Sequence, residues 1–216
     1  MRPFMNALNK SFLEFTTIDE AHSVDESMIP YYGRHGTKQF IRGKPIRWRY
    51  KFWIGTTRLG YIEWFEPYQE FTSTIPNKYK NVELDSGVVL TFADELQKNF
   101  PNLPFHLYFD NFFTSLSLLH HLKNRGLKGT GTIKANRITD IALSHPNEHK
   151  KQNRDSYEYM LDAGKKIVTC RWNDNNLATL ASNNASVKPL SQVKRFSQRE
   201  KKYIMVEQSR IIKKIQ

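Results

Sequence analysis

Residues 46–54 carry the pattern that most restricts what this chain can fold into. Apolar side chains alternate there with basic ones, and the apolar set is Ile46, Trp48, Tyr50, Phe52 and Ile54. A period of two places the two sets on opposite faces of an extended strand, which predicts a half-buried strand with its basic residues towards solvent. Residues 55–60 are predicted to form a turn and residues 61–65 a returning strand, so the chain contains a hairpin and therefore a sheet.

Helices are predicted on both sides of this hairpin in the sequence. Apolar residues recur at helical spacing over residues 3–16 and 88–96, and the second helix is expected to begin after Gly87. A third helix is predicted to follow a cap on Thr114 or Ser115. Extended segments are predicted at residues 22–30, 105–109, 129–133, 157–161, 167–172 and 177–182. This order of elements predicts an α/β fold with an inserted or appended β-rich module.

Composition restricts the class of protein and of partner. Hydrophobic residues make up 39% of the 216 residues and charged residues 25%, so a core can form and a disordered polyelectrolyte is excluded. No apolar run approaches the roughly 20 residues that span a bilayer, and the N-terminus lacks a signal peptide, which predicts a soluble intracellular protein. The net charge of +12 attracts polyanions, most simply nucleic acid, although a merely soluble basic protein would carry the same charge.

Zinc chemistry is not predicted. The single cysteine, Cys170, excludes an internal disulfide and a cysteine-rich zinc module, and it is expected to be a small buried apolar residue. His120 and His121 are adjacent on a predicted helix and do not share a face, and His145 and His149 lie in a polar stretch. Neither pair has partners at the spacing of a metal site.

Two aspartates are candidate metal ligands. Asp25 lies inside the strand predicted over residues 22–30, where burying a charge is costly, and Asp110 ends the most apolar strand, where sheet ends commonly build sites. If the two strands are neighbours, the carboxylates meet, and paired carboxylates suit Mg²⁺ or Mn²⁺. Glu26 is expected on the opposite side of its strand and is not predicted as a ligand. The alternative is that Asp110 and Asn111 only form the turn between strand and helix.

Two basic segments are candidate DNA contacts. Residues 37–51 hold six basic side chains and no acid, with aromatic residues between them, and residues 188–202 hold six basic side chains and one acid. Basic residues contact phosphates and aromatic rings stack on exposed bases, whereas in the alternative reading the rings belong to the core and the cations are solvated. The predicted DNA-binding residues are Lys38, Arg42, Lys44, Arg47, Arg49, Lys194, Arg195 and Arg199.

Five segments, in order along nearly the whole chain, resemble the piggyBac-type transposases. SVDESMIPYYGR at residues 23–34 is similar to the family's first catalytic-aspartate motif, and KQFIRGKPIR at residues 38–47 to the basic stretch after it. FDNFFTSL at residues 109–116 resembles the second aspartate motif, and GTGTIKANR at residues 129–137 the strand that follows. KRFSQREKK at residues 194–202 resembles the basic run before the third acid.

This resemblance implies a function. The family has a ribonuclease H-like fold and cuts DNA at transposon ends with Mg²⁺ (or Mn²⁺), with water and then the freed 3′-hydroxyl as nucleophile, and it integrates at TTAA targets. By resemblance, Asp25 and Asp110 are the first two members of the acidic catalytic set and the ligands of the metal. The expected fold is a ribonuclease H-like mixed sheet with flanking helices, interrupted by a small β-rich insertion. The expected partner is DNA, without a membrane, and the expected location is the nucleus.

The expected division of the chain also follows from the resemblance. Residues 1–19 are expected to be a remnant of an upstream helical region, residues 20–136 the ribonuclease H-like core, residues 137–196 the β-rich insertion and residues 197–216 a basic tail leading towards the third acid. The full-length family can form a homodimer, and its dimerising region is expected to be missing from these residues.

The family's third acid has no counterpart here. The family continues from the basic run into a Gly-Gly-Val-Asp segment, which these residues do not contain, and Glu200 and Glu207 lie in the wrong context to replace it. The sequence therefore predicts a transposase-derived DNA-binding protein that is catalytically incomplete. The alternatives are an active Mg²⁺-dependent transposase or nuclease seen as a truncated sequence, and a non-catalytic module that binds nucleic acid or protein.

Overall fold

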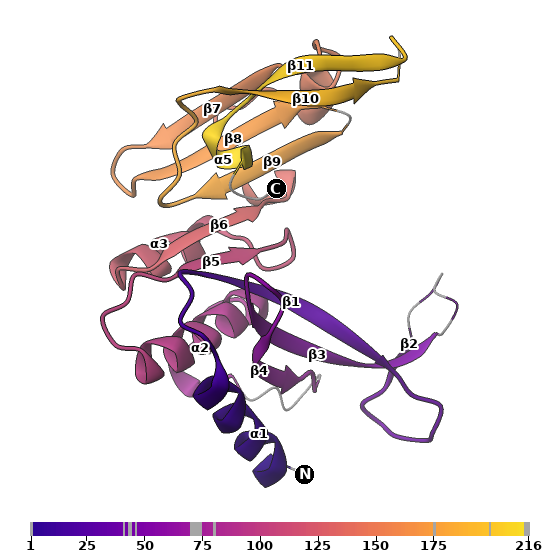
Figure 1. Ribbon diagram of the computed structural model, residues 1–216, viewed down its shortest axis with the longest axis vertical. Helices are drawn as coiled ribbons and strands as arrows, with labels where there is room; N and C mark the ends of the chain where they lie inside the picture. Colours follow the sequence, from indigo (N-terminus) through magenta and orange to yellow (C-terminus); the bar gives the residue numbers. More distant parts are fainter. Residues whose placement is uncertain are drawn as a thin grey trace. The chain divides into compact units, whose positions relative to one another are not determined.

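The computed structural model describes residues 2–40, 42, 45, 47–69, 75–79, 81–174, 176–198 and 200–213. The chain divides into two compact units, residues 1–107 and 108–216 (Figure 1). Lys44 and Arg199, two of the predicted DNA-binding residues, lie outside the described residues. The four-part division expected from the sequence stays a prediction.

The first unit is built around one central strand. Its elements are α1 (Arg2–Phe15), β1 (Ala21–Pro30), β2 (Gln39–Phe40), β3 (Trp48–Thr57), β4 (Ile62–Pro67), the 3₁₀ turn η1 (Asn77–Tyr79) and α2 (Leu84–Asn99). β3 pairs antiparallel with β1, β2 and β4, so the hairpin predicted from the alternation is present. The backbone N–H of His106, at the start of β5 (His106–Phe109), donates to the carbonyl of Glu20 just before β1 (2.7 Å).

The predicted buried face of β3 is wrong. The fully buried positions are the odd-numbered Trp53, Gly55 and Thr57, whereas Phe52 and Ile54 are only half-buried and Trp48 is exposed. Both faces of the strand are covered in part, because Phe52 packs on Phe65 (ring centroids 6.0 Å apart), which also contacts Phe12 of α1 (6.1 Å). A two-sided environment of this kind erases the simple alternation of apolar and polar residues.

Two glycines that were predicted to interrupt elements lie inside them instead. β3 continues through Gly55, where an added Cβ would lie 2.4 Å from the Phe92 ring, so glycine lets α2 approach the strand closely. The turn is confined to residues 58–60 and ends at Gly60, whose φ of +85° favours glycine. α2 begins at Leu84 and includes Gly87, where an added Cβ would lie 3.1 Å from Ile75.

The second unit is rich in strands. Besides the end of β5, its elements are α3 (Leu116–Asn124), β6 (Lys128–Thr132), η2 (Ala135–Arg137), α4 (Pro146–His149), β7 (Tyr157–Asp162), β8 (Ile167–Asn173), β9 (Leu177–Ser182), β10 (Ser191–Ser197), β11 (Lys202–Gln208) and α5 (Arg210–Lys213). The hydrogen-bonded order is β5-β6-β9-β8-β7, and β10 and β11 form a separate antiparallel hairpin.

The core of the second unit joins these strands to the hairpin. Val168, Cys170 and Trp172 of β8 cluster with Val206 of β11 and with Ile211 of α5. In Figure 1 the yellow β10–β11 hairpin lies over the orange strands β7 to β9, as this cluster requires. The strands predicted at residues 157–161, 167–172 and 177–182 are confirmed, whereas β10 and β11 were not predicted.

α3 begins as expected, because the Ser115 hydroxyl accepts a hydrogen bond from the backbone N–H of Leu118 (3.1 Å). Gly126, two residues after its end, takes φ +73°. Among the helices of the described residues, none has both the length and the apolar character to cross a membrane.

Candidate functional site

Asp25 lies in the middle of β1, and its side chain is exposed. Strand alternation buries Val24 and turns Asp25 to the other face, opposite Ile54 in the pairing with β3. The Asp25 Oδ1 accepts a hydrogen bond from the backbone N–H of Glu26 (2.7 Å). The position in the strand is as predicted, but the expected cost of burying this charge does not arise, because solvent reaches the carboxylate.

Asp110 follows β5 directly and is also exposed. Its Oδ1 accepts from the backbone N–H of Phe112 (2.8 Å), and its carbonyl accepts from the N–H (3.2 Å) and hydroxyl (2.7 Å) of buried Thr114. The turn chemistry considered as an alternative is therefore present. Because it fixes the carboxylate beside the end of a buried strand, it is compatible with a ligand role.

Two further residues, which the sequence did not single out, hold the loop that contains Asp110. Arg137 Nη1 donates to the carbonyls of Phe112 (2.9 Å) and Thr114 (2.8 Å). Gly131 of β6 faces the same loop, and an added Cβ would lie 2.3 Å from the Thr114 hydroxyl and 2.5 Å from the Phe109 carbonyl. Both belong to the GTGTIKANR segment, which thus supports the second aspartate motif.

The two acids belong to different units, so their meeting at one site stays a prediction. Within the part of the chain that the structure describes, no group of three or more His, Cys, Asp or Glu side chains is placed to hold a metal ion. The chemistry of the two donors nevertheless fits Mg²⁺ or Mn²⁺, because both are exposed carboxylates whose hard oxygen atoms these cations prefer.

Two other acids near the motifs, Glu26 and Glu200, form ion pairs. Glu26, beside Asp25, forms an ion pair with Lys51 of β3 (2.7 Å). Glu200 pairs with Lys202 (3.1 Å) at the turn of the β10–β11 hairpin, and Glu207 is exposed on β11.

A buried polar network, which was not predicted from the sequence, holds the start of β1. His22 Nδ1 lies 2.6 Å from Glu63 Oε2, and both side chains are almost fully buried. His22 Nε2 donates to the carbonyl of Asp19 (2.9 Å), and the Thr16 hydroxyl donates to Glu63 Oε1 (2.8 Å). The Phe105 ring lies edge-on to His22, with ring centroids 4.9 Å apart. The network ties β1 to β4 three residues before Asp25.

The first basic segment presents both cations and rings to solvent. Arg42 and Arg47 are exposed, Arg49 is half-buried, and Lys38 Nζ donates to the Gly33 carbonyl (2.9 Å). Phe40 and Trp48 keep 52% and 44% of their surface exposed and contact each other with ring centroids 5.2 Å apart. Lys38 Nζ lies 4.6 Å from the centre of the Trp48 ring. The alternative that these aromatic residues belong to the core is wrong for Phe40 and Trp48.

In the second basic segment, the two predicted contact residues that the structure describes differ in environment. Lys194 is exposed on β10, and its Nζ lies 5.0 Å from the centre of the Tyr203 ring. Arg195 is half-buried, and its Nε lies 3.8 Å from Asp174, which also accepts from Arg154 (2.5 Å). Lys194 is therefore more accessible to a phosphate than Arg195 is.

Cys170 is fully buried in the core of the second unit, which confirms its prediction as a small apolar residue. Burial raises the pKa of its thiol to about 11, so it is not a nucleophile at neutral pH.

Glu158 of β7 is the centre of a polar cluster in the second unit. Burial raises the pKa of its carboxyl, but hydrogen bonds from the Ser144 hydroxyl (2.7 Å) and backbone N–H (3.1 Å), together with nearby His149 and Arg171, outweigh burial. The net result is a pKa below the ordinary 4.5.

A depressed carboxyl pKa predicts a specific loss of stability in acid. The Glu158 carboxylate should stabilise the fold fully above the unfolded-state pKa, and its contribution should disappear as the pH falls below about 4.5 through the folded-state pKa. We expect the difference in free energy of unfolding between the unchanged chain and Glu158→Gln to shrink from pH 6 to pH 3, as measured by urea denaturation. Glu148→Gln, at an exposed site, is the control, and a difference independent of pH would contradict this assignment.

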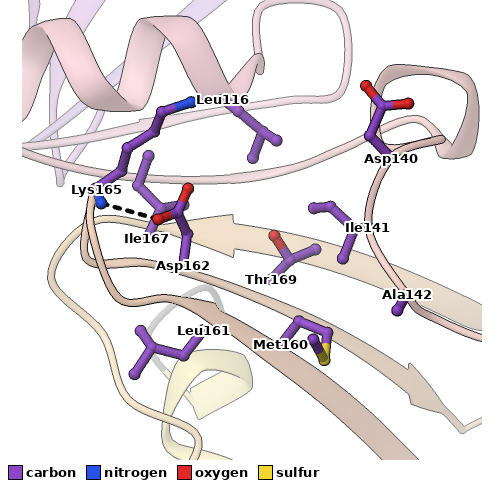
Figure 2. A pocket seen from close by; sticks show the side chains of 10 residues that line it. All are labelled: Leu116, Asp140, Ile141, Ala142, Met160, Leu161, Asp162, Lys165, Ile167 and Thr169. Atoms are coloured by element: carbon purple, nitrogen blue, oxygen red, sulfur yellow. Dashed lines mark hydrogen bonds between the residues drawn. The ribbon is translucent and has the colours of Figure 1, made fainter.

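An apolar pocket of about 270 Å³ lies in the second unit, and its lining contains none of the predicted site residues (Figure 2). Its lining is formed by Leu116, Asp140, Ile141, Ala142, Met160, Leu161, Asp162, Lys165, Ile167 and Thr169. Neither candidate acid belongs to it, so the candidate catalytic residues are not found in this hollow.

Comparison with known proteins gives consistent matches. Residues 1–215 match the protein family described as transposase IS4. The chain is 44% identical over 214 residues to the human piggyBac transposable element-derived protein 3, and 37% identical over 213 residues to the human piggyBac transposable element-derived protein 2. Each alignment covers 99% of this chain, but the chain spans only 35% and 36% of the lengths of these relatives.

The fold is similar to that of a solved structure. A cryo-EM structure of the piggyBac transposase synaptic complex with hairpin DNA matches 94% of this chain and 40% of the other chain, with a TM-score of 0.69 and 16% sequence identity. At that identity the likeness concerns the fold alone. It confirms the predicted ribonuclease H-like α/β fold with a mixed sheet and flanking helices.

Proposed function

Because this chain belongs to the piggyBac-type transposases, within the family described as transposase IS4, we propose that its 216 residues bind DNA and carry two catalytic carboxylates. The observation that carries the proposal is that the family match extends over residues 1–215 and that both motif aspartates, Asp25 and Asp110, are exposed. Its setting is DNA transposition in the nucleus, and a homodimer is part of the proposal for the full-length protein.

Each part of the proposal has its own support. The DNA-binding role is supported by the net charge of +12 and by the exposed Arg42, Arg47 and Lys194. The solved transposase of similar fold is in a complex with hairpin DNA. The metal role is supported by the donor chemistry of the two aspartates, which would hold Mg²⁺ or Mn²⁺.

Such a cation, when bound, supplies activation of water and stabilisation of the leaving oxygen in phosphodiester cleavage. Other residues of the chain hold the two aspartates in position. The pairing of β1 with β3 fixes the backbone of Asp25, and Arg137 and Thr114 fix the loop of Asp110. The exposed cations of the first basic segment would hold the phosphates of the DNA.

We propose further that these 216 residues do not cut DNA by themselves. The sequence matches the family's motifs at two aspartates, and neither Glu200 nor Glu207 lies in the context of the third. With Mg²⁺ or Mn²⁺ and supercoiled DNA, the chain is expected to leave the DNA intact. Nicking that disappears in Asp25→Ala would contradict this part of the proposal and would favour an active enzyme.

Removal of two exposed arginines should weaken DNA binding in a way that depends on salt. For Arg42→Ala/Arg47→Ala, we expect the slope of log K against log salt to fall in magnitude by about 1.8, because each lost phosphate contact contributes about 0.9. Fluorescence anisotropy with a duplex across a salt series measures the slope.

The control for this experiment removes the same charge elsewhere. Lys10→Ala/Lys98→Ala removes two exposed lysines from α1 and α2 and should leave the slope nearly unchanged. Equal effects of the two double variants would mean that only net charge matters. Preference for RNA over duplex DNA in competition would favour an RNA-binding module instead.

A further inference from the structure

The β10–β11 hairpin carries aromatic side chains on a face that the core does not use. Val193 and Val206, which pair across the hairpin, pack in the core of the second unit. Strand alternation therefore turns Phe196, Tyr203 and Met205 to the other face, where 40%, 63% and 60% of their surfaces are exposed. These three residues and Lys194 are called the outer face of the hairpin.

The members of the outer face form one connected surface. Phe196 pairs with Tyr203 in the strand register, and their rings meet edge to face with centroids 5.4 Å apart. Lys194 pairs with Met205, and its Nζ lies 5.0 Å from the centre of the Tyr203 ring. Large aromatic rings exposed in this way are costly in water and are typical of binding surfaces.

The charge around the rings indicates a polyanion. Lys194 lies at the Tyr203 ring, and Lys201 and Lys202, just before Tyr203 in the sequence, are exposed. Of the nearby acids, Glu200 is engaged by Lys202. Glu207 faces Gln192, near the end of the hairpin that is distant from the Phe196–Tyr203 pair. Cations around exposed rings are the combination that binds single-stranded nucleic acid, in which phosphates meet the cations and bases stack on the rings.

We propose that the outer face of the β10–β11 hairpin binds unpaired nucleotides of DNA, with bases stacked on Tyr203 and Phe196 and a phosphate at Lys194. The inference rests on the proposed function and makes it more specific. An intact duplex keeps the faces of its bases stacked on one another, so only unpaired or distorted DNA offers them to these rings. The outer face thus recognises the form of the DNA and not its sequence.

The test separates stacking from charge. Phe196→Leu/Tyr203→Leu keeps the face apolar and removes both rings, and Met205→Leu is the control on the same face. Fluorescence anisotropy with labelled oligothymidine should show at least about tenfold weaker binding for the double variant, since each stacked base contributes at least severalfold in affinity. Binding of a blunt duplex should change by less than about twofold, because phosphate contacts dominate it.

The outcomes distinguish the two proposals. If the unchanged chain binds neither probe, the proposed DNA-binding function fails. If it binds the duplex while the double variant keeps its affinity for oligothymidine, only the stacking inference fails. If the double variant differs from the unchanged chain in its sedimentation coefficient but not in its affinity for oligothymidine, the outer face contacts protein and the inference is overturned. Thermal denaturation of both variants verifies that they are folded.

Discussion

Replacing Glu63 with alanine is expected to lower the free energy of unfolding by about 3–5 kcal/mol, because it leaves a buried polar partner without its acceptor. Glu63 accepts from the Thr16 hydroxyl and lies 2.6 Å from His22 Nδ1, with both side chains of the pair almost fully buried. In Glu63→Ala, His22 Nδ1 and the Thr16 hydroxyl both lose this partner. Urea denaturation measures the loss.

Two further variants make this expectation specific to the buried network. Glu63→Gln keeps the size of the side chain and an oxygen that accepts from the Thr16 hydroxyl, so it should lose less stability than Glu63→Ala. Glu14→Ala, which breaks the exposed ion pair with Lys10 on α1, should cost no more than about 1 kcal/mol. A loss in Glu63→Ala no larger than in Glu14→Ala would refute the role of the network.

Gly131→Ala is expected to have the second large effect, lowering the free energy of unfolding by about 1–3 kcal/mol through overpacking. The new Cβ would lie 2.3 Å from the Thr114 hydroxyl and 2.5 Å from the Phe109 carbonyl. The Phe109 carbonyl is part of the backbone, and the Thr114 hydroxyl is buried and donates to the Asp110 carbonyl. Neither group can therefore move without moving the Asp110 loop. Chemical denaturation gives the stability change, and NMR shifts of residues 109–114 give the displacement.

A second glycine provides the control for Gly131→Ala. Gly164, in the turn between β7 and β8, has only the Asp162 carboxylate near its added Cβ, at 3.5 Å, which is ordinary contact. Gly164→Ala should therefore change the free energy of unfolding by less than about 0.5 kcal/mol. Similar stability of the two variants, with unshifted NMR signals in the Asp110 loop, would show that β6 does not constrain the loop.

The fold class could be predicted because local patterns agree with it. The hairpin follows from the alternation at residues 46–54, and α3 follows from its serine cap. The phase of burial on β3 could not be predicted, because Phe12 and Phe65, from α1 and β4, pack on its second face. β10 and β11 were missed because apolar residues, among them Phe196, Tyr203 and Met205, stand at exposed positions beside polar ones, so no simple alternation marks the buried face. Of their apolar residues, Val193, Ile204 and Val206 pack in the core.

Strand position singled out Asp25 and Asp110 in the sequence, and only the motifs that resemble a family assigned them a catalytic role, which stays a prediction. Strand position alone left turn formation open for Asp110. The contacts that hold the segments around the two aspartates could not be predicted from the sequence. Glu63 lies 41 residues from His22, and Arg137 lies 25 residues from Phe112, and no local pattern links such distant partners. The exposure of the rings on the outer face likewise follows only from the register of the hairpin.

The most direct test of the central claim is titration of the chain with Mn²⁺, followed by electron paramagnetic resonance of the free ion. If Asp25 and Asp110 share one divalent cation, the unchanged chain binds it, and Asp25→Asn and Asp110→Asn each abolish the same binding. Asp140→Asn, which alters a carboxylate at the apolar pocket, retains it. Binding that survives either of the first two substitutions unchanged would contradict the claim that both aspartates hold the metal.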